Sequence, residues 1–199
     1  GEGMDARSVS IDLDRFTLVG ATTRFGGLSR PLSDRFQITL RLDYYSAEEM
    51  IPILKRSVEK MDMELDDQAL ANLSLRCRGT PRVANRLLSR IRDFQNVFPM
   101  LGPSEIVEHA LDRIGIGPLG LDKEDLRYLA ALKRNGAPMG LSTISAAISE
   151  PSESIEDVIE PFLLRNGLIS RTPRGREITE AGEEILLSCR ARQQDAVTV

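Results

Sequence analysis

Apolar and polar residues follow two different periods along the chain. Near the start, Val9 and Ile11 alternate with polar neighbours, which predicts a half-exposed strand, with a flexible arm as the alternative. Apolar runs at 15–20 and 37–43 predict two further strands, the first of them buried. Beyond these runs the apolar positions recur at helical spacing. The pattern therefore predicts a mixed, mainly α fold that opens with the end of an α/β domain over 1–42.

Four helices are predicted in the next segment: one from 46, one over 67–77, one from 80 to 97 and one over 104–114. Ser46 and Glu49 have the spacing of a capping box at the start of the first helix. Thr80 is a candidate N-cap for the third. Pro81 then occupies the first helical position, where its missing N–H costs nothing. We expect these helices to form a small domain over 43–117.

The run 115–120 is rich in glycine and proline and predicts a linker. Beyond it the pattern predicts helices over 122–134, 143–149 and 154–166, two strands about a turn at 172–175, and a helix over 180–189. The expected N-caps of the first three helices are Asp122, Ser142 and Ser154. Pro161 lies inside the third and should bend it. Three helices and a hairpin predict a winged-helix domain over 118–192.

Composition narrows the classes of function. The formal net charge is −4, so bulk charge does not indicate nucleic-acid binding, and any DNA contact must use local basic patches. Arginine makes up 22 of the 26 basic residues, which suits phosphate binding but also suits a GC-rich genome. Cys77, Cys189 and the single His109 lack metal-ligand spacing, so we expect no metal site and reduced thiols, as in a cytoplasmic protein. No apolar run is long enough to cross a membrane, so no membrane partner is expected.

Residues 20–36 have the composition of a phosphate-binding strand end. The predicted buried strand leads into two threonines, the second of which is Thr23, and hydroxyls at this place can polarise a water or a phosphate oxygen. The following loop supplies the planar, permanently charged side chains of Arg24, Arg30 and Arg35.

The other half of a nucleotide site is missing from the sequence. There is no G-x-x-x-x-G-K-[ST] motif, no Gly-Lys pair and no apolar run that ends in Asp-Glu. This chain alone is therefore expected neither to bind ATP tightly nor to hydrolyse it.

A basic stripe runs along the helix predicted from 80 to 97, where Arg82, Arg86 and Arg90 recur on one face. Arg82 lies in the first turn, where its charge opposes the helix dipole. A bound anion would reverse that balance, and a merely solvated arginine is the alternative.

Three more arginines, Arg171, Arg174 and Arg176, surround the turn of the predicted wing. The helix that would enter the major groove is acidic, with Glu153, Glu156, Asp157 and Glu160. We therefore expect DNA contacts through the wing, made to phosphates and without strong sequence preference. A winged helix used only for protein packing is the alternative.

Five motifs occur together and in order: GATTR, RPLSDRF, RGTPRVANRLLSRIRD, LGLD and RTPRGR. Through them the chain resembles the AAA+ ATPases, and most closely the RuvB family, over essentially its whole length. The resemblance implies an ATP-hydrolysing, Mg²⁺-dependent hexameric DNA helicase that works on double-stranded DNA with RuvA. Its task would be Holliday junction branch migration in recombination and repair. The resemblance also implies that this chain is the C-terminal part of a longer protein.

The same resemblance assigns roles to single residues. Thr23 would be the sensor-one hydroxyl that positions the attacking water, and Arg35 the arginine finger that reaches the ATP of a neighbouring subunit. Arg82, directly after Pro81, would be the sensor-two contact to the γ-phosphate. Val9 and Ile11 would contact RuvA.

Two other classes of function stay open at this point. One is a non-enzymatic winged-helix DNA-binding regulator, which predicts sequence-selective binding by 118–192. The other is a structural fragment that only contributes to contacts within a ring.

Overall fold

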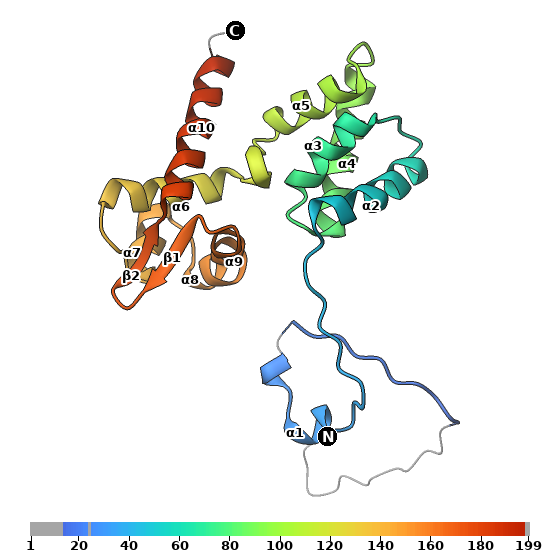
Figure 1. Ribbon diagram of the computed structural model, residues 1–199, viewed down its shortest axis with the longest axis vertical. Helices are drawn as coiled ribbons and strands as arrows, with labels where there is room; N and C mark the ends of the chain where they lie inside the picture. The colour runs from blue at the N-terminus through green and yellow to red at the C-terminus, as the bar shows by residue number, and fades with distance from the viewer. Residues whose placement is uncertain (1–13, 24, 198–199) are drawn as a thin grey trace, which may run out of the picture. The chain divides into compact units, whose positions relative to one another are not determined.

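The computed structural model describes residues 14–23 and 25–197, with side chains described as far as Cys189. The chain divides into two units, 1–42 and 43–199. Val9 and Ile11, and the strand expected around them, lie outside the described residues. Most of the described chain is helical (Figure 1), which confirms the mainly α prediction.

The described part of the first unit has little regular structure. It contains a 3-10 turn, η1 (Phe25–Gly27), and one short helix, α1 (Arg30–Ser33). The strands predicted at 15–20 and 37–43 are not formed, so these two predictions are wrong. A strand is stable when a neighbouring strand takes up its backbone hydrogen bonds, and no described segment pairs with either run.

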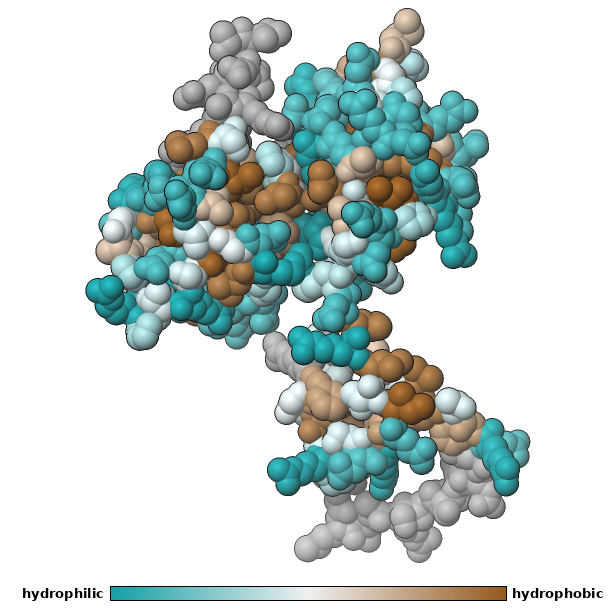
Figure 2. All heavy atoms as spheres, in the orientation of Figure 1, coloured by the Kyte–Doolittle hydropathy of each residue, from teal (hydrophilic) through white to brown (hydrophobic). Residues whose placement is uncertain are grey.

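The apolar side chains of these two runs are consequently uncovered. Figure 2 shows apolar side chains gathered on the surface of this unit. Those that are more than half exposed are Phe16, Leu18, Val19, Ile38, Leu40 and Leu42. Side chains of this kind are usually buried in a sheet core, so the segment has the composition of a core strand without the neighbouring sheet.

Residues 47–113 form a four-helix domain. Its helices are α2 (Ala47–Lys60), α3 (Asp67–Arg76), α4 (Pro81–Val97) and α5 (Pro103–Arg113). Their apolar faces meet in one core, whose fully buried members include Met50, Leu54, Leu73, Leu88, Ile91, Ile106 and Leu111. Each helix lies where the apolar positions recur at helical spacing, and each buries its apolar stripe against the other helices.

Local signals set where these helices begin. Ser46 and Glu49 form the predicted capping box: the Glu49 N–H donates to Ser46 Oγ at 3.1 Å, and the Ser46 N–H donates to Glu49 Oε2 at 2.9 Å. Helix α5 starts one residue before the predicted Ser104, at Pro103, which suits a first helical position. The Ser104 hydroxyl instead donates to the Asp66 carboxylate at 2.9 Å.

The winged-helix domain begins after a 3-10 turn, η2 (Pro118–Gly120). Its helices are α6 (Lys123–Asn135), α7 (Leu141–Ile148), α8 (Ser152–Ser154), α9 (Glu160–Arg165) and α10 (Glu180–Val197), with a π turn, η3 (Ile155–Ile159), between α8 and α9. Strands β1 (Ile169–Thr172) and β2 (Gly175–Ile178) pair antiparallel, with Ile169 opposite Ile178. A second core lies among these elements and includes Leu121, Tyr128, Leu129, Leu132, Ile144 and Leu163.

Two helix starts in this domain differ from the prediction. Helix α7 is capped by Gly140 and not by Ser142. The helix predicted from Ser154 begins after Pro151 and is divided into α8, η3 and α9. Pro161 has no N–H and its ring clashes with an ordinary α turn, so the backbone widens into the π turn directly before it.

The hairpin is held near its turn by a third segment of chain. Met139 and Arg176 exchange two backbone hydrogen bonds, each of 2.8 Å. Gly175 has a φ of +136°, and a Cβ at this position would lie 2.4 Å from the Met139 carbonyl oxygen. Only glycine fits there, so the wing joins the body of the domain by direct backbone contact.

Candidate functional site

The loop that carries Thr23 and Arg35 folds back on its own start. The Phe36 ring lies against Gly20, where a Cβ would sit 3.2 Å from the ring. Thr23 and Arg35 are both exposed, and the Arg35 N–H donates to the Leu32 carbonyl at 3.2 Å, just after α1. Both predicted catalytic residues therefore lie in one loop, and no carboxylate of the described chain pairs with the Arg35 guanidinium.

Arg82 lies in the first turn of α4, with Pro81 at the first helical position. Thr80 has the extended backbone of an N-cap, but its hydroxyl donates back to the Cys77 carbonyl at 3.4 Å and does not cap α4. The first turn thus has no side-chain acceptor for its N–H groups and contains no acidic residue. Together with the exposed Arg82 side chain, this helix start can receive an anion.

The turn before α4 is pressed against the segment that enters the four-helix domain. Gly79 has a φ of +69°, and a Cβ there would lie 2.5 Å from the Tyr45 carbonyl oxygen. The Tyr45 N–H donates to the Gly79 carbonyl at 3.0 Å. The backbone just ahead of Arg82 is therefore in direct contact with the backbone that enters the domain.

Arg78, next to this turn, joins the four-helix domain to the winged-helix domain. Its Nε donates to the Gly120 carbonyl at 2.8 Å, and its Nη2 contacts Asp122 at 2.9 Å and Asp125 at 2.5 Å. Its Cζ lies 4.4 Å from the centre of the Phe162 ring. Asp125 is 1% exposed, and burial raises the pKa of its carboxyl to about 7 against the opposing effect of Arg78.

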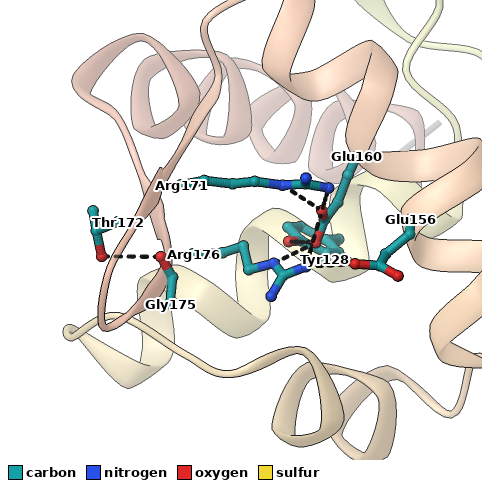
Figure 3. A network of polar contacts seen from close by, with 7 residues as sticks. All are labelled: Tyr128, Glu156, Glu160, Arg171, Thr172, Gly175 and Arg176. Carbon is teal, nitrogen blue, oxygen red and sulfur yellow. Dashed lines mark hydrogen bonds and ion pairs between the residues drawn. The ribbon is translucent and has the colours of Figure 1, made fainter.

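Arg171 and Arg176 point from the hairpin toward Glu160 on α9 (Figure 3). Arg176 Nε donates to Glu160 Oε1 at 2.9 Å, and Arg171 Nε donates to Oε2 at 3.0 Å. The Tyr128 hydroxyl donates to Oε1 at 2.9 Å, and Arg176 also reaches Glu156 at 3.0 Å. Glu160 is fully buried. Burial alone would raise the pKa of its carboxyl, but the hydrogen bonds from Arg176, Arg171 and Tyr128 lower it, so Glu160 stays ionised.

Arg174 differs from the other two wing arginines. It lies exposed in the turn between β1 and β2, and it forms no ion pair with any described residue. The sequence pattern had placed Glu160 on an acidic surface that faces DNA, whereas the structure buries it as the counter-charge of Arg171 and Arg176. Of the three predicted DNA contacts, Arg174 is thus the one whose charge is not neutralised within the described chain.

Family models match the chain in three consecutive parts. The RuvB P-loop domain of the Holliday junction DNA helicase matches 1–42, the RuvB AAA lid domain 45–117, and the RuvB C-terminal winged helix domain 118–187. The Holliday junction branch migration complex subunit RuvB of Orientia tsutsugamushi (strain Boryong) is 48% identical over 184 residues, which is 90% of this chain. The chain belongs to the RuvB family.

Further comparisons agree with this membership. The RuvB subunit of a Wolbachia strain from Brugia malayi is 47% identical over 94% of this chain. The solved structure of the Thermotoga maritima RuvB Holliday junction branch migration motor is 40% identical, with a TM-score of 0.76 over 86% of this chain and 59% of its own. The chain covers 56% of the Orientia protein and 57% of the Wolbachia protein, and so spans a little over half the length of these relatives.

The predicted site residues are distributed over the three matched parts of the chain. Thr23 and Arg35 lie in the segment matched by the P-loop model, Arg82 in the lid and Arg174 in the winged-helix domain. Arg78 was not among the residues singled out from the sequence, although it links the turn before Arg82 to the winged-helix domain.

The buried thiol of Cys77 and the imidazole of His109 lie in packed surroundings that fit a structural role. Cys77 is buried, and loss of solvation raises the pKa of its thiol to about 12, so the thiol stays protonated. His109 packs edge-on against Phe94 and Phe98, and its Nε2 is buried without a partner among the residues described. In the same part of the chain, no three His, Cys, Asp or Glu side chains group as metal ligands. A helix both long and apolar enough to span a membrane is likewise absent from the described ranges.

Proposed function

We propose that this chain is the C-terminal part of an ATP-driven hexameric motor that promotes Holliday junction branch migration in DNA recombination and repair, together with RuvA. The observation that carries the proposal is Arg82. Its side chain is exposed at an uncapped helix start inside the segment that matches the RuvB lid. A cation in that position opposes the helix dipole, and a bound phosphate would offset that opposition.

The residues present fit one part of an ATP site. Arg82, in the turn begun by Pro81, would contact the γ-phosphate within its own subunit, and Arg35 would reach the γ-phosphate of a neighbouring subunit. Thr23 would hold the attacking water through its hydroxyl. ATP with Mg²⁺ would supply the phosphoryl group that is transferred. The chain's own residues would orient the water and stabilise the charge that develops on the phosphate.

No residue here fits the remainder of that site. The phosphate loop and the carboxylates that hold Mg²⁺ have recognisable motifs, and neither motif occurs in the sequence. We therefore propose that this chain alone binds little or no ATP or ADP and hydrolyses neither.

Within the motor, the winged-helix domain would hold double-stranded DNA through the wing. Arg174 would contact a backbone phosphate, which gives binding without strong sequence preference. The exposed acidic residues Glu153 and Asp157 remain on the α8–η3 face and disfavour entry of that face into the major groove. This charge distribution supports a gripping role over that of a sequence-reading regulator.

The proposed motor also has protein partners and a location in the cell. Val9 and Ile11 would contact RuvA, the ring would form from six copies of the full-length protein, and the motor would act in the cytoplasm. The division into 1–42, 43–117 and 118–192 would then separate sensor, lid and DNA-gripping functions.

The sharpest test of the proposal uses a form of the chain extended to the length of its relatives. In that form Arg82→Ala should lower ATP turnover by about 100-fold, the loss typical of a removed charge-stabilising donor. Arg86→Ala is the matched control, since Arg86 lies one turn later on the same exposed face of α4. Equal turnover in the two variants would remove the assignment of Arg82.

A second experiment asks whether Arg35 acts across subunits. In the extended form, Arg35→Ala should abolish most ATP turnover while nucleotide affinity is kept. Arg15→Ala, which removes an exposed arginine outside the loop of 20–36, should change neither. Mixing the Arg35→Ala protein with a protein that lacks a working phosphate loop should restore part of the turnover, because each supplies what the other lacks. Absence of rescue at every mixing ratio would argue against a role across the interface.

A further inference from the structure

The backbone of Arg78 adopts a conformation that its residue type rarely takes. Its φ is +52°, in the left-handed region, which is unfavourable for a side chain with a Cβ. Such a conformation persists when the surroundings hold it in place. The Arg78 side chain is held by groups of the other domain, the Gly120 carbonyl and the carboxylates of Asp122 and Asp125. The backbone of the turn is also held from the four-helix domain, where the Tyr45 N–H donates to the Gly79 carbonyl. The turn at 78–80 is thus held from both domains at once.

The linker leaves little freedom at this joint. Gly120 has a φ of +80°, and a Cβ there would lie 2.4 Å from the Arg76 carbonyl oxygen, so the linker touches the end of α3 directly. The Gly117 N–H donates to the Leu121 carbonyl at 2.8 Å, which closes the linker into a tight turn. The two domains therefore meet through backbone contact and not through a flexible tether.

A second arginine reaches the same turn from the winged-helix domain. Arg165 ends α9, and its Nη2 donates to the carbonyl of Arg78 at 2.9 Å. Its Cζ lies 3.6 Å from the centre of the Tyr44 ring, at the entrance to the four-helix domain. Tyr45 in turn contacts Gly79. Arg165 thus contacts both of the segments that meet just before Arg82: the turn at Arg78 and the segment at Tyr44.

The wing and the sensor-two turn are connected through one short helix. Glu160 begins α9 and holds Arg171 and Arg176 of the wing, and Arg165 ends the same helix five positions later. From Arg165 the contacts continue to Arg78, and Pro81, with its fixed φ, lies between that residue and Arg82. Packed and ion-paired contacts therefore form a continuous path from the wing to the turn before Arg82.

We propose that Arg78 and Arg165 are positioning residues that clamp the winged-helix domain to the turn before Arg82, so that engagement of duplex DNA by the wing sets the orientation of the nucleotide sensor. The coupling rests on the proposed function, but the clamp itself is a property of this chain alone. Two experiments separate them.

The first experiment measures the clamp in the present chain, without nucleotide or DNA. Spin labels at Lys60→Cys on α2 and Asn135→Cys on α6 report the distance between the two domains, and both sites are exposed. Arg78→Ala should broaden the distance distribution, because the ion pairs to Asp122 and Asp125 are lost. Arg56→Ala, which removes an exposed arginine from α2, should leave it unchanged. An equally narrow distribution in the Arg78→Ala protein would overturn the clamp.

The second experiment measures coupling in the extended form. The ATPase rate is compared with and without duplex DNA, and DNA affinity is measured in parallel. Arg165→Ala should reduce the stimulation by DNA about fivefold or more, the lower end of typical coupling factors, while DNA affinity and the rate without DNA stay close to those of the parent protein. A purely structural role would not separate stimulation from affinity in this way.

Variants of Tyr44 provide the matched control. Tyr44→Phe keeps the ring beneath the Arg165 guanidinium and should keep the stimulation, whereas Tyr44→Ala should lose it. If the parent protein itself shows no stimulation by DNA, the proposed motor function fails. If it shows stimulation that Arg165→Ala and Tyr44→Ala both retain, the coupling fails while the motor function stands.

Discussion

Arg176 donates a hydrogen bond of 2.9 Å from Nε to Oε1 of Glu160, a carboxylate that is completely buried. An arginine expected to face DNA phosphates therefore takes part in the interior of the domain. We therefore expect loss of the Arg176–Glu160 pair to lower the folding stability of the domain more than it lowers DNA affinity.

Glu160→Gln should lower the free energy of unfolding by about 3 kcal/mol, because it leaves the wing arginines without their buried counter-charge. The pKa of Glu160 is lowered in the folded state, so its contribution is present above the ordinary value of 4.5 and is lost as the pH falls through the lowered value. Urea unfolding at neutral pH measures the loss. Glu156→Gln, which removes the exposed partner of Arg176, should change stability by less than about 1 kcal/mol. Equal losses in the two variants would contradict a special role for the buried carboxylate.

Arg174→Ala should weaken binding of duplex DNA to a similar degree for every sequence, and it should lower the slope of log affinity against log salt by about 1, as expected for one lost phosphate contact. Its unfolding midpoint should stay unchanged. Arg171→Ala should instead lower the midpoint, because Arg171 pairs with Glu160. Fluorescence anisotropy over a range of salt concentrations measures the loss of DNA binding, and thermal unfolding measures the loss of stability in each variant. A salt slope that Arg174→Ala leaves intact would remove this residue from the DNA contact.

The stability of the joint should depend on pH through Asp125. Its pKa is raised in the folded state from 3.8 to about 7 by burial, and Arg78 and Asp122 are the charged groups that contact it. A carboxyl whose folded pKa is raised binds its proton more tightly in the folded state, so stability falls as the pH rises between these two values and is constant above them.

Asp125→Asn should remove this component. The difference in unfolding free energy between the parent chain and Asp125→Asn should therefore change between about pH 4 and about pH 7 and stay level from about pH 7 to about pH 9. Denaturant unfolding at a series of pH values supplies both curves. Parallel curves for the two proteins across the acid range would mean that Asp125 does not titrate as described.

Gly79→Ala should destabilise the chain by more than Gly136→Ala, although both glycines have left-handed backbones, with φ of +69° and +65°. At Gly136 an added Cβ meets nothing within 4 Å, so only backbone strain of about 1 kcal/mol is expected. At Gly79 the Cβ would lie 2.5 Å from the Tyr45 carbonyl oxygen, and the two segments would have to separate. Urea denaturation measures the loss of unfolding free energy in each variant, and the difference between them reports the contact between Gly79 and Tyr45. Identical losses would show that these two segments separate at little cost.

Short-range chemistry made several elements predictable. The capping box of Ser46 and Glu49 and the first-turn position of Pro81 involve residues within a few positions of one another, and both occur as expected. Gly136 ends α6 in a left-handed conformation, which glycine adopts without the steric cost of a Cβ. Apolar positions at helical spacing located the helices for the same reason, because the hydrogen bonds and the apolar face of a helix join residues three or four positions apart.

The errors arose where a residue depends on distant parts of the chain. The strands expected at 15–20 and 37–43 require a neighbouring strand, which no local pattern can supply. Glu160 looked like a surface acid because its partners Arg171 and Arg176 are 11 and 16 positions away. Arg78 meets Asp125 across a separation of 47 positions.

The sequence alone determined the helices, their order, the winged-helix hairpin and the five motifs that indicate the RuvB family, because these depend on local periodicity and on residues close in the chain. The tertiary structure decided which arginines remain available. Arg171 and Arg176 are neutralised by the buried Glu160, Arg174 has no such partner among the described residues, and Arg78 links the two domains next to the turn before Arg82. A charge is neutralised by whatever lies next to it in space, and that neighbour is set only when the domains have packed.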